Sequence, residues 1–362
     1  MLTVECPLNS LSFGNVSVNI LRELYRLGKE IALFPIGDKV DLAAYKLDPE
    51  FTAWMEDSIN KRWERYDSSG PALKLWHIRG AENRKCQNQF LYTFHECSEP
   101  TEVELSIVRN QTFTFFSSEY SAGLFCGAGI TNCNAVPLGF DQDFKVETNP
   151  RKPDGIQFGL MGKFEYRKRT EKIIKTWLKE FGNKIGYTLN LCVTNPFFQP
   201  DDMKNVLAAC FEGEHYSNVN ILPYLETNQD VNAFLNIVDI DLSGLSGGEG
   251  WNLPAFNSTC LGKWSVVLNA TSHKDWANKL NSILVEPLGK IEAHDGVFFK
   301  KGDAFNQGHF FDWDEAEATE AMKDAASRAG RVNSEGINMS REKTYGKTVD
   351  RILETIANIL DE

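Results

Sequence analysis

The sequence lacks any segment that would tie the chain to a membrane or a secretory route. None of its 362 residues belong to an apolar run of about 18, the length that a membrane-spanning helix needs. The first residues, Met1 to Pro7, contain neither a basic segment nor an apolar core, so we expect no secretory signal. These absences predict a cytoplasmic protein with no membrane span.

Cysteine pairs at metal-binding or redox spacing are also missing. The eight cysteines are scattered, none form a C-x-x-C pair, and some lie in apolar surroundings, as Cys192 does between Leu191 and Val193. This pattern argues against a zinc site and a disulfide framework. It predicts reduced, mostly structural thiols.

Positive charge is in deficit, with 38 Lys and Arg against 50 Asp and Glu and a formal net charge of -12. Such a chain is a poor non-specific ligand for nucleic acids. The local exception is the basic stretch from Arg151 to Lys175, which holds eight Lys and Arg residues. We expect most of this stretch to form a solvated surface.

Short apolar runs alternate with helical periodicity in the first half of the chain. Val16, Ile20 and Leu24 recur at helical spacing, and Gly28 is placed to end that helix. Strands are expected at 31–36, 73–78, 112–116 and 134–138. Alternation of this kind with short connections is typical of a parallel sheet.

The polar segment 145–155 contains two prolines and is the best candidate for a linker. The alternation then starts again. Strands are expected at 156–161, 187–193, 219–222, 237–242 and 264–268, and helices at 168–181, 201–210, 229–235, 252–261 and 344–360. The sequence therefore predicts an α/β protein with two tandem Rossmann-like, doubly wound domains, 1–150 and 151–340. A C-terminal helix, 341–362, is expected to pack back toward the first domain.

A glycine-rich turn, Ser246-Gly247-Gly248-Glu249-Gly250, lies between an apolar strand segment and a predicted helix. Backbone N–H groups of such a turn can hold a phosphate, and Glu249 adds a carboxylate for sugar hydroxyls. The pattern predicts a site for a sugar joined to a diphosphate, and the alternative is a loop that turns only for packing. In tandem α/β domains this turn and those at Gly14 and Lys163 would face a shared cleft.

Four short segments, in this order, resemble retaining glycosyltransferases of the two-Rossmann GT-B architecture, the group often called family 4. They are Gly14-Asn15, similar to an N-terminal glycine loop; 137–141, similar to P-x-G-x-D; 162–168, similar to the G-[RK]-x4-K phosphate motif; and 249–254, similar to the first half of E-x7-E. The resemblance spans most of the chain. It implies transfer of a sugar from a nucleotide-diphosphate sugar, most often a UDP-sugar, to an acceptor hydroxyl, without a metal or other cofactor. It also implies that domain 1–150 forms the acceptor side and domain 151–340 the donor side.

The resemblance also implies roles for single residues. Glu249, His77 and Lys168 are the implied catalytic groups. The implied donor-binding residues are Gly14, Asn15, Lys163, Lys168, Gly250, Trp251, Asn252, Leu253 and Asn257. Asn257 stands where the family has its second carboxylate, which binds the ribose hydroxyls, and an amide makes such a bond without the added strength of charge. This departure keeps open a catalytically inactive sugar-nucleotide-binding or scaffold protein.

Other polar residues have two interpretations each. His77 ends a predicted strand and would lie near the reacting carbon, or it is a satisfied histidine at a strand end; His95 and Glu96 could lie near the acceptor. The pair Asp239 and Asp241 has the D-x-D spacing of a metal site, but it lies in a strand-like segment, so we assign it to packing and predict no metal.

The acceptor stays open. The chain has the general look of phage-encoded family members that modify hydroxymethylated DNA bases, and a glycan is the other candidate. The aromatic-rich segment 294–313 either packs or shapes the cleft. Oligomeric state is not predicted.

Overall fold

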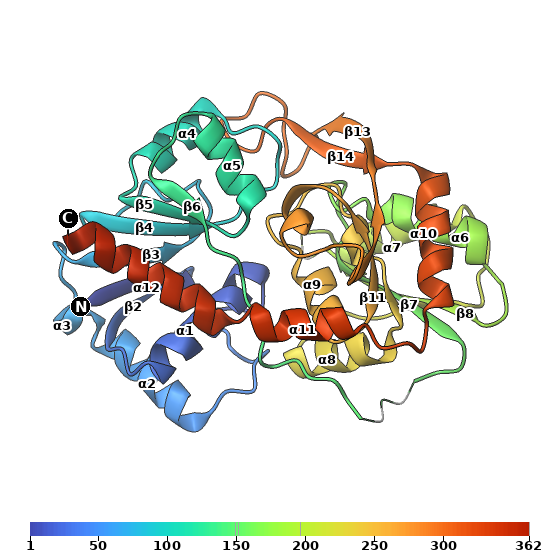
Figure 1. Ribbon diagram of the computed structural model, residues 1–362, viewed down its shortest axis with the longest axis horizontal. Coiled ribbons are helices and arrows are strands. Elements are labelled where there is room, and N and C mark those ends of the chain that lie inside the picture. Colours follow the sequence, from blue (N-terminus) through green and yellow to red (C-terminus); the bar gives the residue numbers. More distant parts are fainter. Residues whose placement is uncertain (149, 151, 196, 362) are drawn as a thin grey trace.

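The computed structural model describes residues 1–148, 150, 152–195 and 197–361. Two six-stranded sheets, each with parallel pairing throughout, form the centres of two domains that lie side by side. Figure 1 shows the first domain in blue to teal and the second in green to orange. The predicted architecture of two tandem doubly wound domains is therefore confirmed.

The first sheet has the strand order β2-β1-β3-β4-β5-β6. Its strands are β1 (Leu2–Pro7), β2 (Ile31–Ile36), β3 (Pro71–Leu75), β4 (Asn88–Thr93), β5 (Phe113–Phe116) and β6 (Cys133–Ala135). Its helices are α1 (Ser12–Arg26), α2 (Pro49–Asn60), α3 (Arg62–Arg65), α4 (Glu102–Arg109) and α5 (Glu119–Gly127). Gly28 ends α1 with a φ of 63°, as the sequence predicted, whereas β1 and β4 were not among the predicted strands.

The second sheet has the order β12-β11-β10-β7-β8-β9. Its strands are β7 (Ile156–Lys163), β8 (Tyr187–Thr194), β9 (Val219–Ile221), β10 (Ile240–Asp241), β11 (Trp264–Leu268) and β12 (Ser282–Val285). Its helices are α6 (Thr170–Phe181), α7 (Pro200–Phe211), α8 (Asn228–Ile237), α9 (Leu253–Cys260) and α10 (Glu315–Ser327). The strand expected at 237–242 is shorter than predicted because α8 continues through Ile237. The helix expected from Lys168 starts at Thr170 because Arg169 before it is left-handed, with a φ of 56°.

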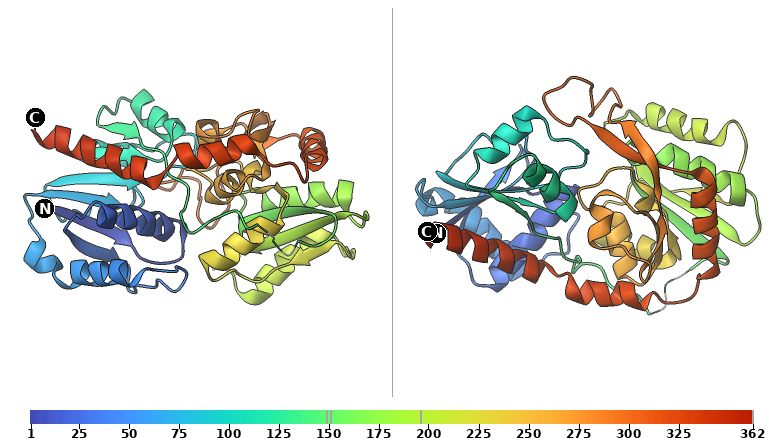
Figure 2. Two further views of the ribbon diagram at one scale, coloured as in Figure 1. Left: turned by 60° about the horizontal axis from the view of Figure 1, so that its bottom comes forward. Right: turned by 45° about the horizontal axis from the view of Figure 1, so that its top comes forward.

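The C-terminal helix returns to the first domain. Helix α11 (Ser334–Glu342) packs against α9, and α12 (Tyr345–Asp361) packs against α1. Val349, Ile352 and Ile356 of α12 belong to the same buried cluster as the core of the first sheet. Both further views show α12, in red, running along the first domain (Figure 2). This confirms the predicted return of the last helix.

The predicted linker 145–155 is only partly a free connection. The backbone N–H groups of Lys145 and Glu147 donate to side chains of Asn232 and Asn236 on α8, at 2.8 and 2.9 Å. Asn149 and Arg151 lie outside the described residues. The domain boundaries at 150 and 340 stay predictions.

No helix in the described ranges is long and apolar enough to cross a membrane. Each of the eight cysteines is a free thiol, as predicted, and seven of them are buried.

Candidate functional site

Each sheet has one place where its strand order reverses. This switch point lies between β1 and β3 in the first sheet and between β7 and β10 in the second. Ligands of open α/β sheets bind outside the carboxyl ends of the strands at such points. The predicted site residues lie at the ends of these strands: Gly14 and His77 follow β1 and β3, Lys163 is the last residue of β7, and Glu249 follows β10. The topology thus assigns both sets to the edges where ligands bind.

The glycine loop, residues 246–250, is buried where the two domains meet. A Cβ added at Gly247 would lie 2.3 Å from the carbonyl oxygen of Phe311, and one at Gly248 would lie 2.7 Å from that of Glu96. A Cβ at Gly250 would lie 2.7 Å from the Cβ of Phe94, a residue of the first domain. Packing therefore explains why all three positions are glycine, whatever else the loop binds.

Glu249 is a buried carboxylate held by two cations. Its Oε1 lies 2.6 Å from Nζ of Lys168, and its Oε2 lies 3.1 Å from Nη1 of Arg167. Burial alone would raise the pKa of Glu249, but the charges of Lys168 and Arg167 outweigh burial and hold the pKa well below its usual range. Glu249 is therefore ionised at neutral pH.

Arg167 is a site residue that the sequence analysis missed. Its guanidinium lies 3.1 Å from Glu165 and 3.2 Å from Glu96, in addition to Glu249, and only 7% of its side chain is exposed. It also donates to the carbonyl of Gly248. The only signal in the sequence was its place next to Lys168 in the basic stretch.

The basic stretch is not mostly a solvated surface, and that prediction was wrong. Besides Arg167 and Lys168, two more of its cations, Arg169 and Lys172, pair with Asp312 at 3.0 and 2.9 Å. Arg151, which opens the stretch, lies outside the described residues. These cations hold loops of the second domain together, and Arg167 also pairs with Glu96 of the first.

Lys163 ends β7 and is more accessible than Lys168. Its ammonium lies 5.4 Å from the ring centre of Phe197 and 5.7 Å from that of Phe298, and 3.5 Å from Oε1 of Glu165. Its side chain is 39% exposed, against 17% for Lys168. The two lysines contact different carboxylates, so Lys163 is the cation with more room for an added anion.

Asn252 is fixed in place by a histidine that the sequence analysis did not select. Asn252 is left-handed, with a φ of 71°, and its side chain caps α9 and lies 2.8 Å from the carbonyl of Ser243. Its Nδ2 also lies 2.9 Å from Nε2 of His273, whose Nδ1 lies 2.9 Å from the carbonyl of Leu268. Both contacts are satisfied when His273 is neutral, because Nδ1–H donates to Leu268 and Nε2 accepts from Asn252.

Of the other predicted donor residues of this domain, Trp251 and Asn257 are buried and Leu253 is partly buried. Trp251 packs in the core, its carbonyl accepts from Nε1 of Trp276 at 3.1 Å, and Lys343 lies 5.6 Å from its ring. Leu253 is the first residue of α9. Asn257, in the middle of α9, is buried, and its Oδ1 has no hydrogen-bond partner in the described part of the chain.

The first domain contributes uncharged rings. Phe13, in the first turn of α1, lies 4.5 Å from the ring of His77 and 4.6 Å from that of Phe94. Gly14 is required by packing, because a Cβ would lie 2.1 Å from the carbonyl oxygen of Asn9, and the side chain of Asn15 contacts Asn19 on α1.

His77 keeps a large exposed surface, yet its ring lies among neighbouring protein atoms. Burial by these neighbours, and next the charge of Lys163, lower the pKa of His77 to about 4. His77 is therefore neutral at physiological pH. Glu96 forms its ion pair with Arg167 at the junction of the two domains.

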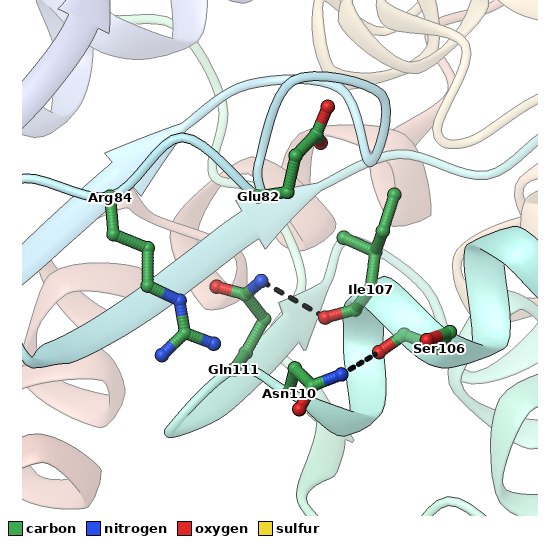
Figure 3. A pocket seen from close by; sticks show the side chains of 6 residues that line it. All are labelled: Glu82, Arg84, Ser106, Ile107, Asn110 and Gln111. Carbon is green, nitrogen blue, oxygen red and sulfur yellow. Dashed lines mark hydrogen bonds between the residues drawn. The ribbon is translucent and has the colours of Figure 1, made fainter.

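One pocket lies where the first domain meets residues 305–306 of the second, and another lies within the first domain. The first, of about 440 Å³, is lined by Trp76, His77, Ile78, Arg79, Gly80, Phe94, His95, Glu104, Phe305 and Asn306. The other, of about 380 Å³, is lined by Glu82, Arg84, Ser106, Ile107, Asn110 and Gln111 (Figure 3).

The pocket of Figure 3 lies where α4 ends and β5 begins, and two of its amides bond to carbonyls of α4. None of the residues that line this pocket is among the predicted site residues.

The D-x-D pair has structural partners. Asp239 accepts from the ammonium of Lys152 and from the backbone N–H of Gln157, and Asp241 is buried beside Ser243. Among the residues that the structure describes, no group of three or more His, Cys, Asp or Glu side chains is placed to hold a metal. Metal independence stays a prediction.

The sequence matches no protein-family model. It also matches no curated protein. Its structure is similar to that of sucrose-phosphate synthase from Thermosynechococcus elongatus, with a TM-score of 0.70 and 11% identity over 99% of both chains. The structure of Anabaena HepE in complex with UDP-glucose is similar with a TM-score of 0.68 and 12% identity over 99% of both chains. A glycosyltransferase from Rickettsia africae is similar with a TM-score of 0.68 and 10% identity, over 99% of this chain and 98% of the other. At such low identity these likenesses establish the fold, and the chain has the two-domain GT-B fold.

Proposed function

We propose that the protein is a glycosyltransferase that moves a sugar from a nucleotide-diphosphate sugar, most readily a UDP-sugar, to an acceptor hydroxyl. The similarity to HepE, whose structure holds UDP-glucose, supports this assignment. The observation that carries it is the buried, ionised Glu249 beside the glycine loop, with Lys168 at 2.6 Å. This is a carboxylate for sugar hydroxyls next to a cation for the diphosphate.

The lysines of the site can stabilise the charge that develops on the leaving group. As the bond between the anomeric carbon and the diphosphate oxygen breaks, negative charge grows on the diphosphate, and preorganised cations stabilise it. Lys163 and Lys168 take this role in the proposal, and Glu249 orients the sugar. Lys168 and Glu249 form an ion pair in this structure. When a donor binds, Lys168 would contact both Glu249 and the phosphate of the donor.

We propose a retaining mechanism without a metal. The new bond forms from the acceptor oxygen to the anomeric carbon, and the acceptor proton passes to the leaving diphosphate, so no dedicated basic residue is needed. His77 is neutral and partly exposed, which suits a hydrogen bond to the donor sugar. The amides of 250–253 and the first turn of α1, at Gly14 and Asn15, complete the proposed donor site.

Asn257 favours a second candidate, an inactive sugar-nucleotide-binding or scaffold protein. Its Oδ1 has no hydrogen-bond partner among the described residues, and in this proposal it accepts from a ribose hydroxyl. Such a bond lacks the strength of a charged acceptor. Membership of family 4, a phage-type origin and a cytoplasmic location stay predictions, and the free thiols support the last of these.

The test is turnover and binding of UDP-glucose by the wild type and by Glu249→Ala and Glu249→Gln. We expect calorimetric binding and slow hydrolysis by the wild type, and loss of turnover in both variants with an unchanged circular dichroism spectrum. Glu171→Gln, on an exposed part of α6, is the matched control and should keep its activity.

Full activity of the Glu249 variants would overturn the proposal. Binding without turnover, for every nucleotide sugar in a panel, would instead favour the inactive protein. DNA affinity that falls steeply with salt would select a modified base as the acceptor, and indifference to DNA would select a glycan.

A further inference from the structure

A two-stranded arm of the second domain reaches across to the first. The arm comprises residues 287–313, in which β13 (Pro287–Glu292) pairs antiparallel with β14 (His309–Trp313). Figure 1 shows it, in orange, at the edge of the molecule where α4 and α5 of the first domain lie. From its sequence, the aromatic-rich segment 294–313 of this arm either packs or shapes the cleft.

The connection between the two strands of the arm is docked on the first domain by polar contacts. Ser98 and His309 exchange two hydrogen bonds, of 3.1 and 3.0 Å. Thr101 donates to the carbonyl of Ala304 at 2.6 Å, and the backbone N–H of Asn306 donates to Glu104 at 3.0 Å. Because backbone groups of the arm make these bonds, its position relative to the first domain is defined.

The arm closes the pocket of about 440 Å³ beside His77. Phe305 and Asn306 form its outer wall, and the rest of the lining comes from the segments that follow β3 and β4 and from Glu104. This volume lies within the range of about 300–1,000 Å³ that is usual for small-molecule sites. The pocket is therefore large enough for a monosaccharide or a nucleobase, and it exists only where the arm meets the first domain.

The lining suits a ring with flat faces and hydroxyl groups. Trp76, Phe94 and Phe305 supply aromatic surface, and the guanidinium of Arg79 lies 5.6 Å from the ring centre of Phe305. His95 lines the pocket with only 3% of its surface exposed, and its Nε2 has no hydrogen-bond partner among the described residues. A buried polar atom without a partner is costly, so His95 is a polar group of the wall with unused hydrogen-bonding capacity.

The pocket adjoins the proposed donor site. Phe94 belongs to its wall and also packs on Gly250 of the glycine loop. His77 lies in the pocket wall and is close enough to Lys163 for the charge of that lysine to affect it. A ligand here would therefore lie beside the sugar of a bound donor.

We propose that this arm-built pocket holds the acceptor, and that the acceptor presents a hydroxyl-bearing ring stacked on Phe305 and Trp76. The inference rests on the proposed function and names the substrate class of that site. The formal net charge of -12 disfavours DNA, so the ring we propose is a pyranose of a glycan, and a hydroxymethylated base is the alternative outcome of the test.

The experiment measures binding of methyl α-D-glucopyranoside and of 5-hydroxymethyldeoxycytidine by saturation-transfer NMR, with UDP present. We expect the wild type to bind the glucoside, and binding of the nucleoside in its place would overturn the assignment of a pyranose. Phe305→Ala should weaken that binding by about tenfold or more, because an aromatic stacking partner is lost. Arg79→Met, at an exposed position, should weaken it less. Leu288→Ala, exposed on the same arm but outside the pocket, should leave it unchanged.

UDP-glucose binding separates this inference from the proposed function. In Phe305→Ala we expect UDP-glucose affinity to match the wild type. If UDP-glucose binds and neither probe does, or if Phe305→Ala and Arg79→Met bind the probe as the wild type does, the acceptor pocket is wrong and the proposed function stands. If UDP-glucose does not bind either, the proposed function fails with it.

Discussion

The two switch points of this molecule use opposite chemistry. In the first domain, Phe13, His77 and Phe94 form a neutral, aromatic edge. In the second, Lys168 and Arg167 hold Glu249 in a buried cluster of charges. The two substrates of the proposed reaction differ in the same way, since the diphosphate of the nucleotide sugar is charged and the acceptor ring is not. The difference supports a donor in the second domain and an acceptor in the first.

The charged edge is also the more fragile of the two. Removing one partner of a buried ion pair leaves an uncompensated charge, whereas an aromatic edge loses only contact area.

Arg167→Met should destabilise the protein most. Glu165 and Glu249 are buried and would lose a cation that lies 3.1 Å from each. Breaking a buried pair in this way costs about 3–5 kcal/mol of unfolding free energy. Lys175→Met, which breaks only the exposed pairs of Lys175 with Glu171 and Glu212, should cost less than about 1 kcal/mol. Urea denaturation of the two variants makes the comparison, and equal midpoints would show that the cluster is not structural.

Lys168→Ala should lower turnover of the nucleotide sugar by about 10²–10³, the usual loss when one preorganised charge-stabilising group is removed. Arg167 remains to hold Glu249, so the fold should survive. Lys168→Arg should recover part of the rate, because it returns a cation to the same place. Lys179→Ala, an exposed lysine on α6, serves as the control in steady-state assays. Wild-type turnover by Lys168→Ala would remove the charged edge from the reaction.

Regular elements and the edges they create were predictable from the sequence. The apolar stripe of α12 predicted a helix that packs on one face, and the alternation of strands and helices placed Lys163 and Glu249 after predicted strands. In parallel sheets that order alone assigns a residue to the ligand-binding edge. Local periodicity therefore carried the fold class and the position of the candidate site.

Contacts between distant segments were not predictable in the same way. The partners of Arg167 come from β4's end, from its own loop and from the glycine loop, so no local pattern joins Glu96, Glu165 and Glu249. His273 reaches Asn252 from a 3₁₀ turn 21 residues away. The arm was visible only as an aromatic-rich segment, because its partners, Ser98 and Thr101, lie in the other domain.

His273 offers a test of the charged edge through pH. Burial lowers the pKa of His273 to about 4, against 6.5 for an ordinary histidine. Between these values the unfolded chain binds a proton that the folded chain does not, so stability falls as pH falls from about 6.5 to 4. The loss should reach about 3 kcal/mol.

His273→Gln should show a shallower decline of stability over that pH window, although it is less stable at pH 7 because Asn252 loses its partner. His215→Gln, at an exposed position, should keep the wild-type slope. Denaturation midpoints measured from pH 4 to 7 test this, and identical slopes for wild type and His273→Gln would contradict the assigned neutral state.

The neutral edge predicts the smallest effect. Because the pKa of His77 is about 4, its charge does not change between pH 5.5 and 8. An ordinary histidine in the site would change charge within that window. The ratio of kcat/KM between wild type and His77→Asn should therefore stay constant across it, even if the variant is slower. A ratio that changes near pH 6.5 would mean that His77 titrates during the reaction, and the first-domain edge would then be charged below that pH, like the edge it faces.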